Sequence, residues 1–300
     1  MKHAGKTLVP RALIADGFRP EYSAIPDLVC KFSDALARAA KHYAAPALNT
    51  DRIDLHYQPH VDLDTGLPVG VEALARWRAG DGRLVAPGDF LPYIPTMKDL
   101  LALDLHVLEK AIRQSVAWAE QGIDPIISVN ISAAHFDCIT LAEEVEKILA
   151  KVPAFNPRKL AIEILESAAI NNTAVAAEII ARLRKRGVRF YLDDFGTGHS
   201  SAAYLKLFPI DAIKLDQIFA RDIPHGPNSG LDTAIIKATV SVAQACGLDV
   251  IAEGVETQEA AIEVKRLGCQ TAQGYYYARP LPERDFAAWY TNRQACMRCS

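Results

Sequence analysis

The sequence predicts an α/β fold, a (β/α)8 barrel in which one strand runs antiparallel to the others. Three observations lead to this prediction. Eight short apolar runs alternate with segments of helical periodicity along a chain of 300 residues, which is a suitable length for such a barrel. Four helical segments are followed by glycine, the residue that most readily adopts the left-handed conformation after a helix. Carboxylates and amides stand at the ends of several apolar runs, where these barrels place their functional groups.

The connections between the predicted strands decide the direction of each strand. The link between the first two, 62–68, is short and contains Thr65-Gly66. It has no room for a crossover helix, so these two strands are expected to form an antiparallel hairpin. The predicted strands are 53–61, 69–77, 126–132, 160–166, 188–194, 211–216, 248–253 and 270–276.

Helical patterns fill most of the gaps between the strands. Thr140 and Glu143 have the spacing of a capping box at the start of one helix. The predicted helices are 97–121, 141–151, 173–186, 199–207, 231–246 and 257–267, and glycines 122, 187, 247 and 268 follow four of them.

The start of the chain differs from the rest. Residues 1–28 lack clear periodicity and contain three prolines, so they are expected to form a tail or a short packing arm. A leading helix is expected at 29–43, and residues 29–300 are expected to form one domain.

Composition excludes several classes of protein. A formal net charge of −3 with 23% charged residues does not indicate a basic surface that binds DNA or RNA, or a polybasic membrane anchor. No apolar stretch reaches the roughly 18 residues that a membrane span requires. The six cysteines are scattered through the chain, which is typical of a cytoplasmic protein rather than of a disulfide framework. Cys296 and Cys299 have CxxC spacing without a second pair, so a frayed tail is favoured over a zinc site.

Six oxygen-bearing side chains near the ends of apolar runs form the candidate site. A carboxylate inside an apolar strand is costly to bury unless it is paired or bound to a cation. None of the six is His or Cys, which favours a hard cation, Mg²⁺ or Mn²⁺. Five carboxylates exceed what one Mg²⁺ usually recruits, and two ions about 3.5–4 Å apart can activate water and stabilise the leaving oxygen of a phosphodiester. The six are Glu72, Asn130, Glu163, Asp193, Asp194 and Glu253.

Each of these residues also has a structural interpretation as an ion-pair partner, a cap or a turn residue. That interpretation is weaker for Asp193 and Asp194, because two adjacent buried anions repel each other, and the set as a whole favours a metal site. Lys214, on the run AIKLDQ, is a candidate to hold the attacking water and favour its hydroxide form. The 194–201 loop contains two glycines. A phosphate cradle and a mobile link to a neighbouring subunit both stay open for it.

Several motifs occur in a fixed order over about residues 31–290, and together they resemble the EAL domain family of cyclic-di-GMP-specific phosphodiesterases. A bare Glu-Ala-Leu tripeptide would carry little information, whereas the ordered series is highly specific. The motifs are Tyr57-Gln58-Pro59, Glu72-Ala73-Leu74-Ala75-Arg76-Trp77, Val129-Asn130-Ile131-Ser132, Glu163-Ile164-Leu165-Glu166, Asp193-Asp194-Phe195-Gly196-Thr197-Gly198, Lys214-Leu215-Asp216, Ala252-Glu253-Gly254-Val255-Glu256 and Gln273-Gly274-Tyr275.

The resemblance implies a TIM-like barrel with an antiparallel first strand and metal-dependent opening of one phosphodiester of cyclic di-GMP to give linear pGpG. It implies that Glu72, Asn130, Glu163 and Asp193 hold one Mg²⁺ or Mn²⁺ ion, and that Asp193 and Asp194, with Glu253 nearby, serve a second. Lys214 is expected to position the attacking water, so that Lys214, Glu253 and Glu72 form the catalytic set. Glu166 is expected to anchor the 194–201 loop, Glu256 to support the site, and Gln58, Arg76 and Gln273 to contact the substrate.

An alternative within the same family is a receptor that binds cyclic di-GMP without cutting it, or a scaffold that signals through protein partners. Degenerate members usually lose acids from the metal set, and this sequence retains all of them, which favours catalysis. The sequence departs from the family pattern at Leu165, at His199 and in 93–99, and none of these positions is an expected metal ligand. The resemblance also implies a homodimer formed near the 194–201 loop.

Overall fold

The structure is a computed structural model that describes residues 52–166, 170–197 and 201–298. The expected tail at 1–28 and the expected helix at 29–43 lie outside the described residues. The expected boundary at residue 29 therefore stays a prediction.

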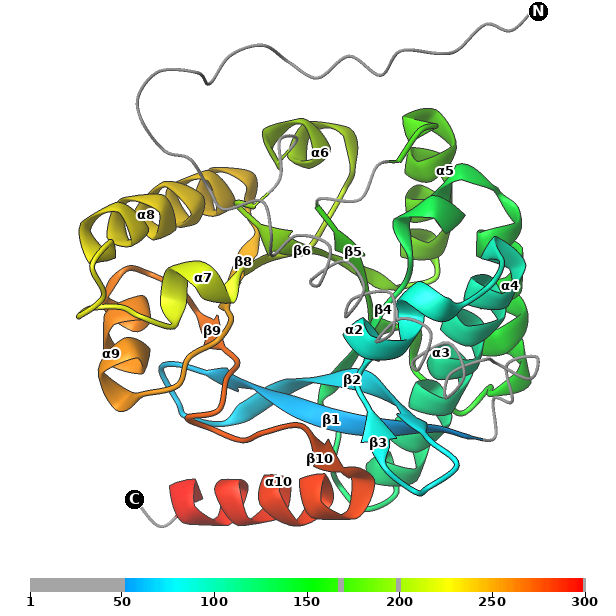
Figure 1. Cartoon of the computed structure of the whole chain (residues 1–300), viewed down its shortest axis with the longest axis horizontal. Coiled ribbons are helices and arrows are strands. Elements are labelled where there is room, and N and C mark those ends of the chain that lie inside the picture. Colours follow the sequence, from blue (N-terminus) through cyan, green and yellow to red (C-terminus); the bar gives the residue numbers. More distant parts are fainter. Residues whose placement is uncertain (1–51, 167–169, 198–200, 299–300) are drawn as a thin grey trace, which may run out of the picture. The chain divides into compact units, whose positions relative to one another are not determined.

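Eight strands close into a barrel, with helices outside the ring (Figure 1). Strand β1 pairs antiparallel with both of its barrel neighbours, β2 and β9, whereas the remaining neighbours in the ring pair in parallel. The predicted barrel with one reversed strand is confirmed. The ring consists of β1 (Ile53–Asp62), β2 (Pro68–Arg78), β4 (Ile126–Asn130), β5 (Leu160–Leu165), β6 (Arg189–Phe195), β7 (Ala212–Leu215), β8 (Asp249–Ala252) and β9 (Thr271–Ala272).

Two short strands extend this ring: β3 (Leu84–Val85) pairs with β2, and β10 (Leu281–Pro282) pairs with β1. The reversal of β1 originates in the turn that follows it. The Asp62 carboxylate accepts hydrogen bonds from the Thr65 backbone N–H and hydroxyl, both at 2.7 Å. Gly66 then takes a φ of 68°, which an L side chain rarely adopts. This compact turn reverses the direction of the chain, so that β2 runs antiparallel to β1.

The helices agree with the sequence pattern over most of their lengths. All four glycines that follow predicted helices have positive φ, between 69° and 100°. The helices are α2 (Pro87–Phe90), α3 (Met97–Ala119), α4 (Thr140–Lys151), α5 (Thr173–Lys185), α6 (Ser201–Leu207), α7 (Gln217–Ala220), α8 (Ser229–Cys246), α9 (Gln258–Arg266) and α10 (Glu283–Arg298), with short 3-10 segments η2 (Leu91–Tyr93), η3 (Ala133–Asp137) and η4 (Pro157–Lys159).

Several sequence predictions about local structure were wrong. The expected capping box fails because Thr140 is the first residue of α4 rather than its cap, and its hydroxyl lies 3.0 Å from the Cys138 sulfur. The last predicted strand, 270–276, is reduced to β9. Helix α10 was missed, and Cys296 lies exposed within it, while Cys299 is outside the described residues. No helix in the described ranges combines the length and the apolarity that crossing a bilayer requires.

A cluster of apolar side chains lies on one face of four neighbouring barrel strands. It consists of Ala161, Tyr191, Ala212 and Ile251, one residue from each of β5, β6, β7 and β8, all of them buried. Alternate residues of a strand face the same side of a sheet. The residues two positions further along these four strands therefore share the inner face with this apolar cluster, nearer to the carboxyl ends of the strands.

Candidate active site

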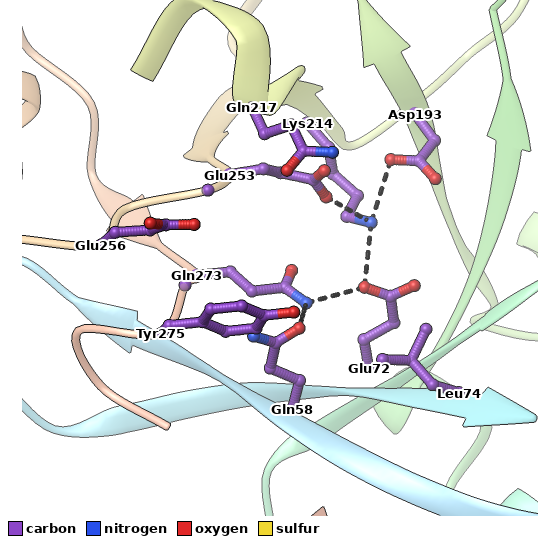
Figure 2. Close-up of a pocket in the computed structure, with 12 residues that line it drawn as sticks. Gln58, Glu72, Leu74, Asp193, Lys214, Gln217, Glu253, Glu256, Gln273 and Tyr275 are labelled. Carbon is purple, nitrogen blue, oxygen red and sulfur yellow. Dashed lines mark hydrogen bonds and ion pairs between the residues drawn. The ribbon is translucent and has the colours of Figure 1, made fainter. Parts of the chain in front are cut away.

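A second set of inward-facing side chains is charged. Two positions beyond the apolar cluster stand Glu163, Asp193, Lys214 and Glu253, and β2 adds Glu72 from across the barrel. Figure 2 shows the Lys214 ammonium directed at Glu72, Asp193 and Glu253. The expected clustering of acids from separate strands is thus present, with a lysine in the middle of the cluster.

Lys214 is 1% exposed and lies within ion-pair distance of four carboxylates. Its Nζ is 2.7 Å from Glu253, 2.8 Å from Glu163, 2.9 Å from Asp193 and 3.3 Å from Glu72. Burial alone would lower the pKa of Lys214, but the surrounding carboxylates raise it well above its usual value. Lys214 is therefore a fixed positive charge within the cluster.

If all of them were ionised, the carboxylates would carry more negative charge than this lysine can neutralise. Burial, reinforced by the charge of Glu72, raises the pKa of Glu163 well above its usual value. Burial also raises the pKa of Glu253 to about 8 and, together with Asp193, that of Asp194 to about 7. Glu72 differs: burial favours its protonated form, but Lys214 and other partners bring its pKa down to about 2. A cluster in which several acids resist ionisation is one that additional cations would stabilise.

Two amides donate hydrogen bonds to the carboxylates. Asn130 Nδ2 donates to Glu72 Oε1 at 2.8 Å and to Glu163 Oε2 at 3.1 Å. Gln273 Nε2 donates to Glu72 Oε2 at 2.8 Å and to Gln58 Oε1 at 3.0 Å. Glu72 is therefore fixed by amides on both of its oxygens. Asn130 presents its NH₂ group here, so its amide must turn before its oxygen can serve as a metal ligand.

The turn after β6 is held by Glu166. Its Oε2 accepts a hydrogen bond from the Gly196 N–H at 2.8 Å, and its own N–H donates to the Asp193 carbonyl at 2.9 Å. Asp194 has a φ of 54°, and Gly196 has a φ of 101°. A Cβ on Gly196 would lie 2.7 Å from the Phe219 ring, so the turn requires glycine there. Glu166 thus fixes the backbone that carries Asp193 and Asp194.

The donor set fits a hard cation. Two groups of side chains bring ligand atoms within 4.8 Å of one another: His60 with Glu72 and Glu163, and Asp193 with Asp194 and Glu253. Glu163 Oε1 is buried and has no hydrogen-bond partner in the described part of the chain. Carboxylate oxygens dominate both groups, which is the preference of Mg²⁺ and Mn²⁺.

A cavity of about 230 Å³ opens over this cluster. It is lined by the predicted Gln58, Glu72, Asp193, Lys214, Glu253, Glu256 and Gln273, and also by Leu74, Gln217, Gly254, Gly274 and Tyr275. Tyr275 lies at its rim with the Arg279 guanidinium 4.1 Å from the ring centroid.

The other predicted site residues do not line the cavity. Four of them belong to the cluster or hold its members in place, as described above: Asn130, Glu163, Asp194 and Glu166. Arg76 is half-buried, and its Nη1 donates to the Ala75 carbonyl at 2.8 Å. The cavity lining adds Gln217, which no sequence argument had assigned. Its position directly after the Lys214-Leu215-Asp216 motif was the available signal.

Comparisons with known proteins support these observations. The model of the EAL domain matches residues 43–280. The chain is 37% identical over 244 residues to the Cyclic di-GMP phosphodiesterase PdeR of Escherichia coli, covering 81% of this chain and 36% of that protein. It is 36% identical over 248 residues to the bifunctional diguanylate cyclase/cyclic di-GMP phosphodiesterase MucR of Pseudomonas aeruginosa, covering 82% and 36%. The chain thus spans a little over one third of the length of these curated relatives.

A solved structure described as the PaMucR phosphodiesterase in complex with c-di-GMP has the same fold. It superposes with a TM-score of 0.72 at 34% identity and covers 87% of this chain and 99% of its own. The motifs, the barrel with its reversed strand and these matches agree. The chain belongs to the EAL domain family.

Proposed function

We propose that the chain hydrolyses one phosphodiester bond of cyclic di-GMP to linear pGpG with the help of two Mg²⁺ or Mn²⁺ ions. The observation that carries the proposal is the ring of carboxylates around Lys214 beneath an open cavity at the carboxyl ends of the strands. The names of PdeR and of the PaMucR complex support cyclic di-GMP as the substrate.

The residues divide between two metal positions. Glu72, Asn130, Glu163 and Asp193 would hold one ion, and Asp193, Asp194 and Glu253 the other. The grouping of Asp193 with Asp194 and Glu253 within 4.8 Å supports the second set. When bound, such ions activate a water molecule and stabilise the leaving oxygen of the phosphodiester.

The chain's own residues orient the substrate and the water. Lys214, with three rotatable N–H donors, holds the attacking water and stabilises negative charge close to it. Gln58 and Gln273 offer amide groups at the cavity wall. Arg76, on the same strand as Glu72, is proposed to turn from the Ala75 carbonyl toward a phosphate, which its planar fork can bind through two parallel hydrogen bonds.

Product analysis tests this function directly. Purified protein incubated with cyclic di-GMP and Mg²⁺ or Mn²⁺ is expected to yield pGpG by chromatography, whereas a chelator or the Glu72→Ala substitution is expected to prevent product formation. Binding of cyclic di-GMP without turnover under both ions would contradict hydrolysis and support the receptor alternative.

The loop anchor gives a separate prediction. Glu166→Ala removes the acceptor of the Gly196 N–H and frees the backbone on either side of Asp194. We expect Mn²⁺ affinity to fall about 10-fold to 100-fold, the usual cost of losing a residue that orients metal ligands. Calorimetric titration with Mn²⁺ and amide hydrogen exchange of residues 194–197 measure the two effects.

Glu166→Gln is the matched control, because its amide oxygen can still accept from Gly196. It is expected to bind Mn²⁺ nearly as tightly as the wild type. Unchanged exchange and unchanged affinity in Glu166→Ala would remove Glu166 from this role.

Assembly through the 194–201 loop stays a prediction. Residues 198–200, including the unusual His199, lie outside the described residues. Leu165, the second departure from the family pattern, is 37% exposed at the end of β5. The third, residues 93–99, contains the start of α3, where the Thr96 side chain accepts a hydrogen bond from the Asp99 N–H.

A further inference from the structure

His60 is a buried imidazole inside the barrel that the proposed mechanism does not use. It lies on β1 two residues after Gln58, so the two side chains share the inner face of the strand. His60 is 3% exposed. The register of β1 against β2 shifts between His60 and Val61, and such bulges re-aim the side chains next to them.

The strand opposite makes room for this ring. His60 pairs with Gly70 of β2, and a Cβ at Gly70 would lie 2.8 Å from His60 Nδ1. The imidazole therefore occupies the space that a side chain at position 70 would fill. Its position is fixed by the bulge on its own strand and by the glycine across from it.

The amide oxygen of Gln273 is buried without a hydrogen-bond partner in the described residues. Its NH₂ group already donates to Glu72 and Gln58. Its Oε1 and His60 Nε2 are both buried, and neither has a hydrogen-bond partner in the described part of the chain. Both side chains lie beside Glu72: Gln273 Nε2 is 2.8 Å from Glu72 Oε2, and a ring nitrogen of His60 lies within 4.8 Å of a Glu72 oxygen. An imidazole can carry its N–H on Nε2 and donate it to an amide oxygen.

We propose that His60 is a positioning residue that donates from Nε2 to Gln273 Oε1 and so fixes which way the Gln273 amide faces. With its oxygen held by the imidazole, Gln273 directs both hydrogens at Glu72 and Gln58. Without that donor the amide is free to turn and to place its oxygen against the Glu72 carboxylate, where the two repel. This inference rests on the proposed function, because His60 would act through Gln273 to orient Glu72 as a metal ligand.

A direct role as a metal ligand is the competing explanation. His60, Glu72 and Glu163 bring ligand atoms within 4.8 Å of one another. The two roles differ in their dependence on Gln273. A positioning residue loses its effect when Gln273 is removed, whereas a ligand keeps its effect.

The test is a double-mutant cycle read out by Mn²⁺ calorimetry, with turnover of cyclic di-GMP measured in parallel. His60→Leu is expected to weaken Mn²⁺ binding about 10-fold to 100-fold, the usual loss when the hydrogen bonds that orient a metal ligand are disturbed. In the Gln273→Ala background the same substitution is expected to change the affinity by less than about 3-fold, within the scatter of independent sites. His60→Gln, whose NH₂ can donate to Gln273, is expected to recover most of the affinity.

Two further variants separate positioning from general loss of structure. Ser128→Ala is the matched control, because Ser128 is buried on β4 and its hydroxyl lies 3.5 Å from the Val71 carbonyl rather than at the acidic cluster. It is expected to leave Mn²⁺ affinity unchanged. Gly70→Ala keeps His60 but displaces the ring, so it is expected to reproduce part of the His60→Leu effect and to lose it in the Gln273→Ala background. This variant carries the test if His60→Leu does not fold.

An equal loss of affinity with and without Gln273 would overturn the positioning role. No loss in either His60→Leu or Gly70→Ala would also overturn it. If the wild type binds Mn²⁺ but does not cut cyclic di-GMP, the proposed function fails, while the Mn²⁺ affinities still decide the role of His60.

Discussion

Replacing Lys214 with alanine is expected to lower the turnover of cyclic di-GMP by about 10²-fold to 10³-fold, the range associated with losing one donor that stabilises developing negative charge. Lys214 Nζ lies within 3.3 Å of four carboxylates, next to the position proposed for the attacking water. The carboxylates themselves stay in place, so binding of metal and of cyclic di-GMP is expected to persist. Turnover and calorimetric binding measure the two effects separately.

The same substitution is expected to change stability in a way that depends on metal. Without Lys214 the buried carboxylates lose their internal counter-ion, and removing one partner of a buried ion pair costs about 3–5 kcal/mol. Thermal unfolding of the metal-free variant is expected at a clearly lower temperature, with much of the loss restored by Mn²⁺, which binds the folded state.

Lys110→Ala is the matched control, because Lys110 Nζ bonds only the Ile53 carbonyl among the contacts described, at 2.6 Å. Its effect on stability is expected to be the same with and without Mn²⁺. Wild-type turnover in Lys214→Ala would remove Lys214 from the mechanism.

Glu163→Gln is expected to have the opposite effect on the metal-free protein. Glu163 is fully buried, and burial together with neighbouring carboxylates raises its pKa. A neutral amide of nearly the same shape removes that repulsion, so the metal-free variant is expected to gain about 0.5–2 kcal/mol in stability, as is common when strain at a functional site is relieved. Mn²⁺ affinity is expected to fall, and turnover with it by about 10²-fold or more, since the ion would be poorly held.

Unfolding in denaturant without metal, compared with Mn²⁺ titration, checks both signs. Glu146→Gln serves as the control: its carboxylate pairs with Arg182 at 2.7 Å near the surface, so its removal is expected to give no gain in stability. A destabilised metal-free Glu163→Gln protein would show that the cluster is already neutralised and would contradict the charge excess described above.

Much of the fold could be predicted from local patterns. The strands of the barrel were recognisable as apolar runs, and the short 62–68 connection settled the reversed direction of β1. Helix α10 escaped prediction because its buried residues, Phe286 and Tyr290, stand among polar ones in a weak pattern. The capping box at Thr140 failed because the backbone is already helical at Ile139, with φ −58° and ψ −21°, so Thr140 lies inside the helix rather than at its cap.

The sequence indicated which acids and amides belong to the candidate site, but not how they lie relative to one another. Its acids and amides could be picked out from the ends of the apolar runs and from the order of the motifs. Gln217 and His60 were missed, because a residue after a motif and a histidine in an apolar strand look unremarkable in sequence. His60 could have been noted as the next inward-facing residue after Gln58, since side chains alternate along a strand.

The sequence by itself determined which residues of each strand share a face, because the two-residue period of a strand is local. It therefore set that, on each of β5 to β8, a charged residue stands two positions after an apolar one on the same face. Only the tertiary structure decided that Lys214 lies among Glu72, Glu163, Asp193 and Glu253, and that Gln273 reaches from after β9 to Glu72 on β2. The physical reason is that these contacts depend on the register between strands and on closure of the barrel. Both arise from pairings between distant segments, such as that of Val61 with Ala272, and neither can be read from the sequence of one segment.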